Sequence, residues 1–321
     1  MSTRLSTLAL TLLPTLLFLS GCDQGKEPAE VREVARQGVY SMTFSADGSD
    51  VLVGSIHHGG SLWSTQPSER IYDWNHVAEG YSNIISSAFS PDGRFIATTD
   101  NRTIVLWQRE SGEAVWYWNA PGDIQDIALT SEGNYALLGM RDFTATLFDI
   151  KNGGIRQRLA HDGIVYDVSI TDDGVLAATG SDDLNARIWN LENGKLLQTL
   201  AHNNQVKTAQ LSKDGRLLFT SALNETGKIW DVASGKLLKE LPPTRGHYSA
   251  AKFADNDAQL LTGNSSGKIE LWNVSTGERL QFWRASPRDT WVSNNVLVED
   301  VSFTGNGWLA AGTNGLLYLL R

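Results

Sequence analysis

The stretch H-D-G-I-V-Y-D-V-S-I-T-D-D-G-V-L-A-A-T-G-S-D-D-L-N-A-R-I-W-N, His161 to Asn190, holds three short apolar runs separated by two polar turns. The aspartate–glycine pair of T-D-D-G suits a tight turn, because glycine adopts a positive φ without steric cost. A further turn, E-N-G-K at Glu192, leads into the alternating run L-L-Q-T-L. The stretch and its continuation therefore predict four short strands joined by tight turns.

The same unit recurs seven times along the chain. The corresponding turns begin at Ser45, Ser90, Thr130, Thr171, Ser212, Ala254 and Thr304. Each is followed by an aromatic residue in a strand-like run, spaced 41 to 46 residues from the next: Trp63, Trp107, Phe148, Trp189, Trp230, Trp272 and Tyr318. One four-stranded sheet cannot bury both of its faces, but seven sheets in a ring bury each face against a neighbour. The sequence predicts an all-β, seven-bladed β-propeller of four-stranded antiparallel blades over residues 30–321.

These repeats resemble the WD-repeat (tryptophan-aspartate repeat) propeller family. In the stretch quoted above, the family's structural tetrad falls on His161, Thr179, Asp183 and Trp189. A half-buried histidine needs partners for both ring nitrogens, and the resemblance implies that the threonine and the aspartate supply them. Partial copies of the set are His76, Thr98 and Trp107; His202, Thr220 and Trp230 with Asn224 at the acid position; and His247, Thr262 and Trp272 with Ser266 there. We therefore expect these histidines to be structural.

Closure of the ring is expected to involve both ends of the propeller. The chain stops at Arg321, directly after the third strand of the seventh copy. The segment E-V-R-E-V-A-R-Q, Glu30 to Gln37, precedes the first strand of copy one and matches the position of a fourth strand. We expect it to complete the last blade and so to remove an exposed sheet edge. The alternative is that this segment belongs to a linker.

The N-terminus has the pattern of an export signal. Arg4 precedes an apolar run, Leu8 to Leu19, which is shorter than the ~20 residues that span a bilayer. The run ends in L-S-G-C, which resembles the lipobox of bacterial lipoproteins. The resemblance implies that residues 1–21 are a signal peptide, that Cys22 carries diacylglycerol and palmitate-type acyl chains, and that 22–29 form a lipidated tether. The alternative is a cysteine beside an uncleaved apolar segment.

The residue after the cysteine indicates in which membrane the lipoprotein would be anchored. Asp23 resembles the signal that keeps a lipoprotein on the periplasmic side of the cytoplasmic (inner) membrane. The inner leaflet of the outer membrane is the alternative. Eight residues of tether extend at most ~30 Å, so the propeller is expected close to the lipid.

Charge and motifs exclude several classes of function. With 27 Lys+Arg and 36 Asp+Glu the net charge is −9, which repels nucleic-acid phosphates. We expect no nucleic-acid partner. The sequence contains no P-loop, HExxH, GxSxG or calcium-loop pattern, so neither an enzyme nor a cofactor is expected. His57 and His58 share a glycine turn, where they could bind metal or simply be solvated.

The family resemblance implies protein recognition at the face formed by the loops that lead into the innermost strands and by the turns between second and third strands. The candidate residues at this face are Tyr40, Gln125, Arg141, Tyr166, Asp182, Lys207, Leu223, Arg245, Tyr248, Arg288, Trp291 and Glu299. The expected function is that of a membrane-anchored periplasmic scaffold. We expect a monomeric propeller that binds other envelope proteins or peptides.

Three acids fall at equivalent places on the innermost strands: Asp126, Asp167 and Asp300. They could form an acidic mouth to the central channel, suited to a cation or a basic peptide. An equally good interpretation is that each carboxylate accepts backbone N–H groups in its own blade. The first interpretation leaves open an alternative function, a propeller enzyme or a sensor of small ligands or cations that uses the channel.

Overall fold

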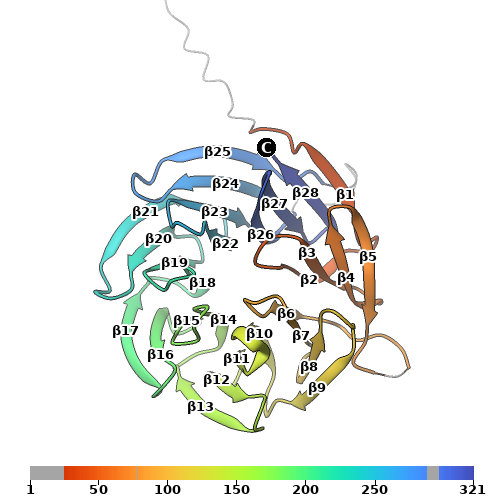
Figure 1. Ribbon diagram of the computed structural model, residues 1–321. Coiled ribbons are helices and arrows are strands. Elements are labelled where there is room, and N and C mark those ends of the chain that lie inside the picture. Colours follow the sequence, from red (N-terminus) through yellow and green to blue (C-terminus); the bar gives the residue numbers. More distant parts are fainter. Residues whose placement is uncertain (1–24, 78, 288–295) are drawn as a thin grey trace, which may run out of the picture.

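The protein is a ring of seven β-sheets around a central channel (Figure 1). The structure is a computed structural model and describes residues 25–77, 79–287 and 296–321. Each sheet has four antiparallel strands, so the predicted seven-bladed propeller is confirmed. The described residues include no helix that is long and apolar enough to cross a membrane.

The blades are numbered here in chain order, each from its innermost to its outermost strand. Blade 1 contains β2 (Val39–Phe44), β3 (Asp50–Ser55), β4 (Gly59–Thr65) and β5 (Ser68–Trp74); blade 2 contains β6 (Ser86–Phe89), β7 (Phe95–Thr99), β8 (Thr103–Gln108) and β9 (Ala114–Asn119). Blade 3 contains β10 (Ile124–Leu129), β11 (Tyr135–Met140), β12 (Thr144–Asp149) and β13 (Ile155–Ala160), with a short 3-10 turn at Ser131–Gly133. Blade 4 contains β14 (Val165–Ile170), β15 (Leu176–Ser181), β16 (Asn185–Asn190) and β17 (Lys195–Ala201); blade 5 contains β18 (Val206–Leu211), β19 (Leu217–Ala222), β20 (Thr226–Asp231) and β21 (Leu237–Pro243). Blade 6 contains β22 (Tyr248–Phe253), β23 (Gln259–Asn264), β24 (Lys268–Asn273) and β25 (Arg279–Arg284); blade 7 contains β26 (Val298–Thr304), β27 (Gly307–Gly312), β28 (Leu316–Leu320) and β1 (Glu30–Glu33).

Blade 7 closes the ring with strands from both ends of the propeller. β1 pairs antiparallel with β28, with Glu30 opposite Leu319 and Glu33 opposite Leu316. The strand is shorter than the predicted segment, because after Glu33 the backbone turns and both Val34 and Ala35 donate to the carbonyl of Gly315. The predicted closure by an N-terminal strand is confirmed.

The hydrophobic core lies between neighbouring blades. β3, near the inside of its blade, is buried along its whole length, whereas β9, at the outside, alternates between exposed and half-buried positions. Tryptophans at the ends of outer strands reach the next blade: Trp74 stacks on Trp107 with ring centroids 4.8 Å apart, and Trp118 stacks on Phe148 at 3.9 Å. Each blade is therefore stabilised by its neighbour.

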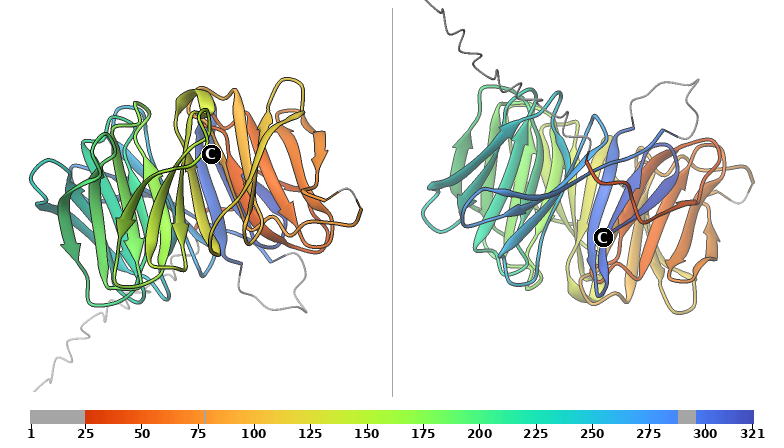
Figure 2. Two further views of the ribbon diagram at one scale, coloured as in Figure 1. Left: turned by 90° about the horizontal axis from the view of Figure 1, so that it is seen from below. Right: turned by 90° about the horizontal axis from the view of Figure 1, so that it is seen from above.

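Seen from the side, the ring is a disc with loops on two faces (Figure 2). We call the face with the loops into the innermost strands and the turns between second and third strands the top face. The bottom face carries the turns between first and second strands and those between third and fourth strands. The predicted interaction residues belong to the top face.

Candidate functional site

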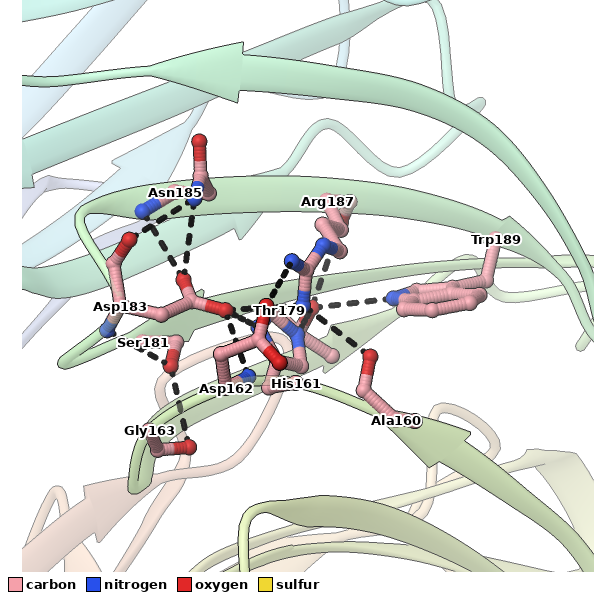
Figure 3. A network of polar contacts seen from close by, with 10 residues as sticks. All are labelled: Ala160, His161, Asp162, Gly163, Thr179, Ser181, Asp183, Asn185, Arg187 and Trp189. Carbon is pink, nitrogen blue, oxygen red and sulfur yellow. Dashed lines mark hydrogen bonds and ion pairs between the residues drawn. The ribbon is translucent and has the colours of Figure 1, made fainter.

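The tetrad of blade 4 joins two elements of the top face (Figure 3). The Nδ1 atom of His161 lies 3.0 Å from Asp183 Oδ2, and its Nε2 atom lies 2.7 Å from Thr179 Oγ1. Trp189 donates to the same threonine hydroxyl at 3.0 Å, so that hydroxyl is left to donate to His161. Arg187 pairs with Asp183 at 2.9 Å.

Burial and the nearby Arg187 lower the pKa of His161 to about 4. At neutral pH the imidazole is therefore uncharged, with the proton on Nδ1 facing Asp183 and the lone pair of Nε2 facing Thr179. Both ring nitrogens have partners. The tetrad therefore connects the loop before β14 to the turn before β16.

Two other blades contain a related network, with the acid at a different position in the turn. In blade 5, His202 lies 3.0 Å from Thr220, but its acid is Glu225, 3.2 Å from Nδ1. Asn224, expected at the acid position, instead adopts a positive φ of 57° in the turn, and the longer glutamate reaches the ring from the next position. In blade 2, His76 Nε2 lies 2.8 Å from Thr98 Oγ1, whereas its Nδ1 lies 3.4 Å from Asp100 and makes no hydrogen bond to it.

The remaining copies of the tetrad are incomplete. In blade 6, Trp272 donates to Thr262 at 2.9 Å. The ring of His247 makes no hydrogen bond to any described residue, and Ser265, not Ser266, accepts from the backbone N–H of His247. Blade 1 has lost the set, because Ala35 stands where a histidine would, and the indole of Trp63 donates to Ser61 at 2.9 Å. A pocket of about 540 Å³ opens there, with Ala35, Ser61 and Trp63 in its wall.

Of the paired histidines of blade 1, His58 lines this pocket. His58 stacks on Tyr81 with ring centroids 5.6 Å apart, and His57 adopts a positive φ of 63° in the turn before β4. Within the described part of the chain, no group of three or more His, Cys, Asp or Glu side chains is arranged to hold a metal ion.

The three aspartates of the innermost strands connect one blade to the next. Asp126 accepts from the backbone N–H of Val168 at 3.0 Å, Asp167 from Ala209 at 2.6 Å and Asp300 from Phe44 at 2.8 Å. In each case the donor belongs to the following blade. The second interpretation of the sequence had placed the donor in the same blade as the aspartate. Asp300 also accepts from its own neighbour Val301 at 2.8 Å.

Hydroxyl groups complete these links around the ring. The four hydroxyl links run from Ser41 to the carbonyl of Ile84 at 3.0 Å, from Ser86 to Asp126 at 2.8 Å, from Thr208 to the carbonyl of Tyr248 at 2.6 Å, and from Ser249 to the carbonyl of Val298 at 2.7 Å. Together with the three aspartates they join all seven innermost strands. The aspartates thus have a structural task that sequence reasoning assigned only in part.

The same acids perturb one another electrostatically. Burial raises the pKa of Asp167 well above its usual range, and Asp126 and Asp300 nearby raise it further. Burial, with Asp300 beside it, also raises the pKa of Glu299 to about 8. These groups line a channel cavity of about 300 Å³, together with Lys252. Glu299 is therefore part of the channel wall, not of the outer rim where it was expected.

A cluster of predicted residues does form at the top face, beside the channel. Lys207 Nζ lies 3.1 Å from the centroid of the Tyr166 ring, and the hydroxyl of Tyr166 lies 3.3 Å from Asp182. Arg141 is close enough to lower the pKa of Tyr166, although burial and Asp182 raise it overall. We call Arg141, Tyr166, Asp182 and Lys207 the rim cluster.

The other predicted residues are placed less uniformly. Tyr40 is exposed, at 41 %, and the side chain of Gln125 donates to the neighbouring carbonyl of Ile124. Leu223 is half-buried and Arg245 is exposed in their loops. Tyr248 was expected at the surface but is buried, and its hydroxyl donates to the carbonyl of Pro242 at 2.8 Å. Arg288, Trp291 and Cys22 lie outside the described residues.

Sequence reasoning missed four exposed apolar residues of the top face. They are Val77, Tyr81, Phe143 and Leu184. Phe143 and Leu184 occupy the tips of their turns with positive φ values of 70° and 68°, where side chains are directed outwards. The sequence signal was an apolar residue directly after an aspartate, in R-D-F-T and D-D-L-N.

Family comparison agrees with this architecture. Residues 74–108, 154–190 and 194–231 match the family described as WD domain, G-beta repeat. A search of the curated proteins found no match to this chain. The three repeat matches and the seven-bladed ring together support a propeller of the WD-repeat type. Propellers of this type commonly mediate protein–protein interactions and are generally not enzymes.

Proposed function

We propose that the chain is a membrane-anchored periplasmic scaffold that binds other envelope proteins or peptides through its top face. The observation that carries this proposal is the distribution of exposed apolar side chains. Val77, Tyr81, Phe143 and Leu184 are exposed in loops and turns of the top face, whereas no described residue in a bottom-face turn is a large exposed hydrophobic residue. Aromatic and arginine side chains at such a face are frequent hot spots of protein recognition.

The rim cluster adds polar specificity to this face. Lys207 over the ring of Tyr166 forms a cation–π pair, and Asp182 and Arg141 place both signs of charge beside it. A partner segment that crosses the channel mouth would meet an apolar tip on one side and paired charges on the other. Such a surface favours a protein or peptide ligand over a small molecule.

The anchor rests on the lipobox-like L-S-G-C that ends at Cys22, with Asp23 supporting retention at the inner membrane. The outer membrane is the alternative location. Mass spectrometry of the mature N-terminus tests this part. Acyl chains on Cys22, absent after Cys22→Ser, are expected, and an unmodified cysteine would contradict it.

The alternative function, an enzyme or a sensor in the channel, requires free polar groups there. Asp126, Asp167 and Asp300 each accept a backbone N–H from the next blade, which favours the scaffold. Thermal melting with and without Ca²⁺ or Mg²⁺ separates the two functions. A concentration-dependent rise in the midpoint, lost after Asp167→Asn, would favour the channel function.

Site-specific photo-crosslinking in the native envelope tests the face itself. The crosslinking residue replaces Phe143 or Leu184 at the top face, and Asn152 or Asn193 in bottom-face turns as matched controls. We expect discrete protein adducts only from the top positions, and their loss after Arg141→Ala and Tyr166→Ala. Equal adducts from both faces would refute a top-face scaffold.

A further inference from the structure

The first described residues of the chain are attached to the outside of blade 6. The backbone N–H of Lys26 donates to the carbonyl of Phe282 at 2.7 Å, and Lys26 forms a parallel bridge with Trp283. The Lys26 ammonium donates to Gln281 at 3.0 Å. A Cβ atom on Gly25 would lie 2.8 Å from the Phe282 ring, and the positive φ of 67° at this position also favours glycine. The chain therefore contacts β25 before it reaches blade 7.

This attachment shortens the tether. Residues 22–29 were expected to extend freely, but only three residues separate Cys22 from Lys26. Four peptide steps extend at most about 14 Å. An acyl anchor at Cys22 thus holds the outer edge of blade 6 next to the membrane surface.

That edge carries a group of cations around one aromatic ring. Lys268 Nζ lies 5.7 Å from the centroid of Phe282, and the guanidinium carbons of Arg279 and Arg284 lie 5.0 and 5.3 Å from it. Arg279 is paired with the buried Glu270 at 3.0 Å, which leaves Lys268, Arg284 and Lys26 as the cations of the edge. We call these three the basic edge. It stands out on a chain whose net charge is −9.

We propose that the basic edge of blade 6 docks on anionic phospholipid headgroups beside the lipid anchor. The proposal rests on the proposed acylation of Cys22, which brings this edge to the bilayer. Cations near an anionic membrane surface each strengthen binding about fivefold, and they act only within about 10 Å in physiological salt. Leu280, exposed on the same strand at 45 %, is placed to enter the headgroup layer.

Docking on this edge would orient the whole ring. The disc would stand on its rim, with the channel axis roughly parallel to the membrane, instead of lying flat with the top face directed away from the lipid. Both faces would then open sideways along the membrane. A partner anchored in the same membrane could reach the rim cluster without passing under the disc.

The test uses the full-length acylated protein in vesicles of phosphatidylcholine, alone or mixed with phosphatidylglycerol. Because the chain has one cysteine and acylation occupies it, Leu280→Cys provides a single free thiol for a fluorescent probe. Tyr117→Cys on β9 of blade 2 is the matched control position. Acrylamide quenching measures how far each probe is shielded from water.

We expect shielding at position 280 only in the phosphatidylglycerol vesicles, reversed by high salt, and none at position 117. Replacing Lys26, Lys268 and Arg284 by Gln should weaken the binding of this edge to the phosphatidylglycerol vesicles by about a hundredfold. The matched control replaces Lys151, Arg156 and Arg158 on blade 3 by Gln and should leave this binding unchanged. Acylated, vesicle-bound protein with equal quenching at 280 and 117 overturns the docking alone. An unmodified Cys22 in mass spectrometry overturns the anchor and the docking with it.

Discussion

The turns of the two faces use their polar side chains in different ways. In the bottom-face turns, Ser90 donates to Asp92 at 2.6 Å and Thr171 to Asp173 at 2.6 Å, and the same geometry recurs at Ser45 and Ser212. Ion pairs then link neighbouring turns, such as Arg94 with Glu132 at 3.3 Å. The polar side chains of the bottom face therefore bond to other groups of the same face.

The top face keeps its polar network underneath and directs apolar side chains outwards. The tetrad of blade 4 lies below the surface, while Phe143 and Leu184 form the tips of turns above it. Rigid polar support with an apolar surface is the combination expected of a recognition face. The comparison separates residues that stabilise the ring from residues that are available to a partner.

The largest effect is expected from the closing strand, which belongs to neither face. Deletion of Glu30–Gln37 removes β1 and exposes the edge of β28, so the unfolding midpoint should fall by about 10 °C or more. Differential scanning calorimetry measures this. Scrambling residues 25–29 leaves β1 in place and serves as the control, for which a smaller shift is expected. An unchanged midpoint after the deletion would mean that the ring does not depend on this strand.

Acid should loosen the top face before the bottom face. Burial and Lys228 lower the pKa of His202 to about 4, below its usual 6.5. Its contribution of about 3 kcal/mol is therefore present above pH 6.5 and is lost as the pH falls towards 4. Burial raises the pKa of Asp92 in a bottom turn, but hydrogen bonds from Ser90 and Arg94 outweigh this and lower it to about 2. Asp92 therefore stays ionised between pH 6.5 and pH 4.

Hydrogen exchange at pH 5 and 7, corrected for intrinsic rates, should therefore show greater loss of protection in the top turns. His202→Gln should reduce this difference in blade 5 only. If both faces lose protection together, the histidines do not control the top turns.

Removal of one bottom-turn acid should cost stability without affecting partners. Asp92 accepts bonds from Ser90, from Arg94 and from the backbone N–H of Glu132 at 2.9 Å. Asp92→Ala should lower the free energy of unfolding by about 1–2 kcal/mol. Urea denaturation measures the loss, and adduct formation at the top face should be unchanged. Loss of adducts in a folded variant would show that the faces are coupled.

The smallest change in stability is expected at the top tips. Phe143→Ser and Leu184→Ser together should alter the free energy of unfolding by less than about 0.5 kcal/mol per site, because both side chains are exposed. Partner binding should fall strongly. Lys151→Ser in a bottom turn is the matched control. A folded double variant with normal partner binding would remove the functional difference between the faces.

The repeat made the ring predictable, since each turn and aromatic residue recurs at nearly constant spacing. The placement of single side chains depended on details that the repeat does not encode. Tyr248 stands where Val165 and Val206 stand in other blades, at the start of an innermost strand whose side chain points into the interface between blades. Glu225 replaced the expected Asn224 because a longer side chain can reach the same histidine from the next residue.

The channel links between blades also determine how far one blade could replace another. Ser41 and Thr208 each donate to a carbonyl, Ser86 donates to a carboxylate, and Asp126, Asp167 and Asp300 accept from a backbone N–H. Ser86 is the member of this set that bonds to a side chain of the next blade, and aspartates stand at the equivalent place in blades 3, 4 and 7. Six of the seven links depend on a backbone N–H or carbonyl of the next blade, which every blade contains. Only the blade that follows blade 2 must bring a carboxylate for Ser86, so these contacts would tolerate the exchange or duplication of most blades.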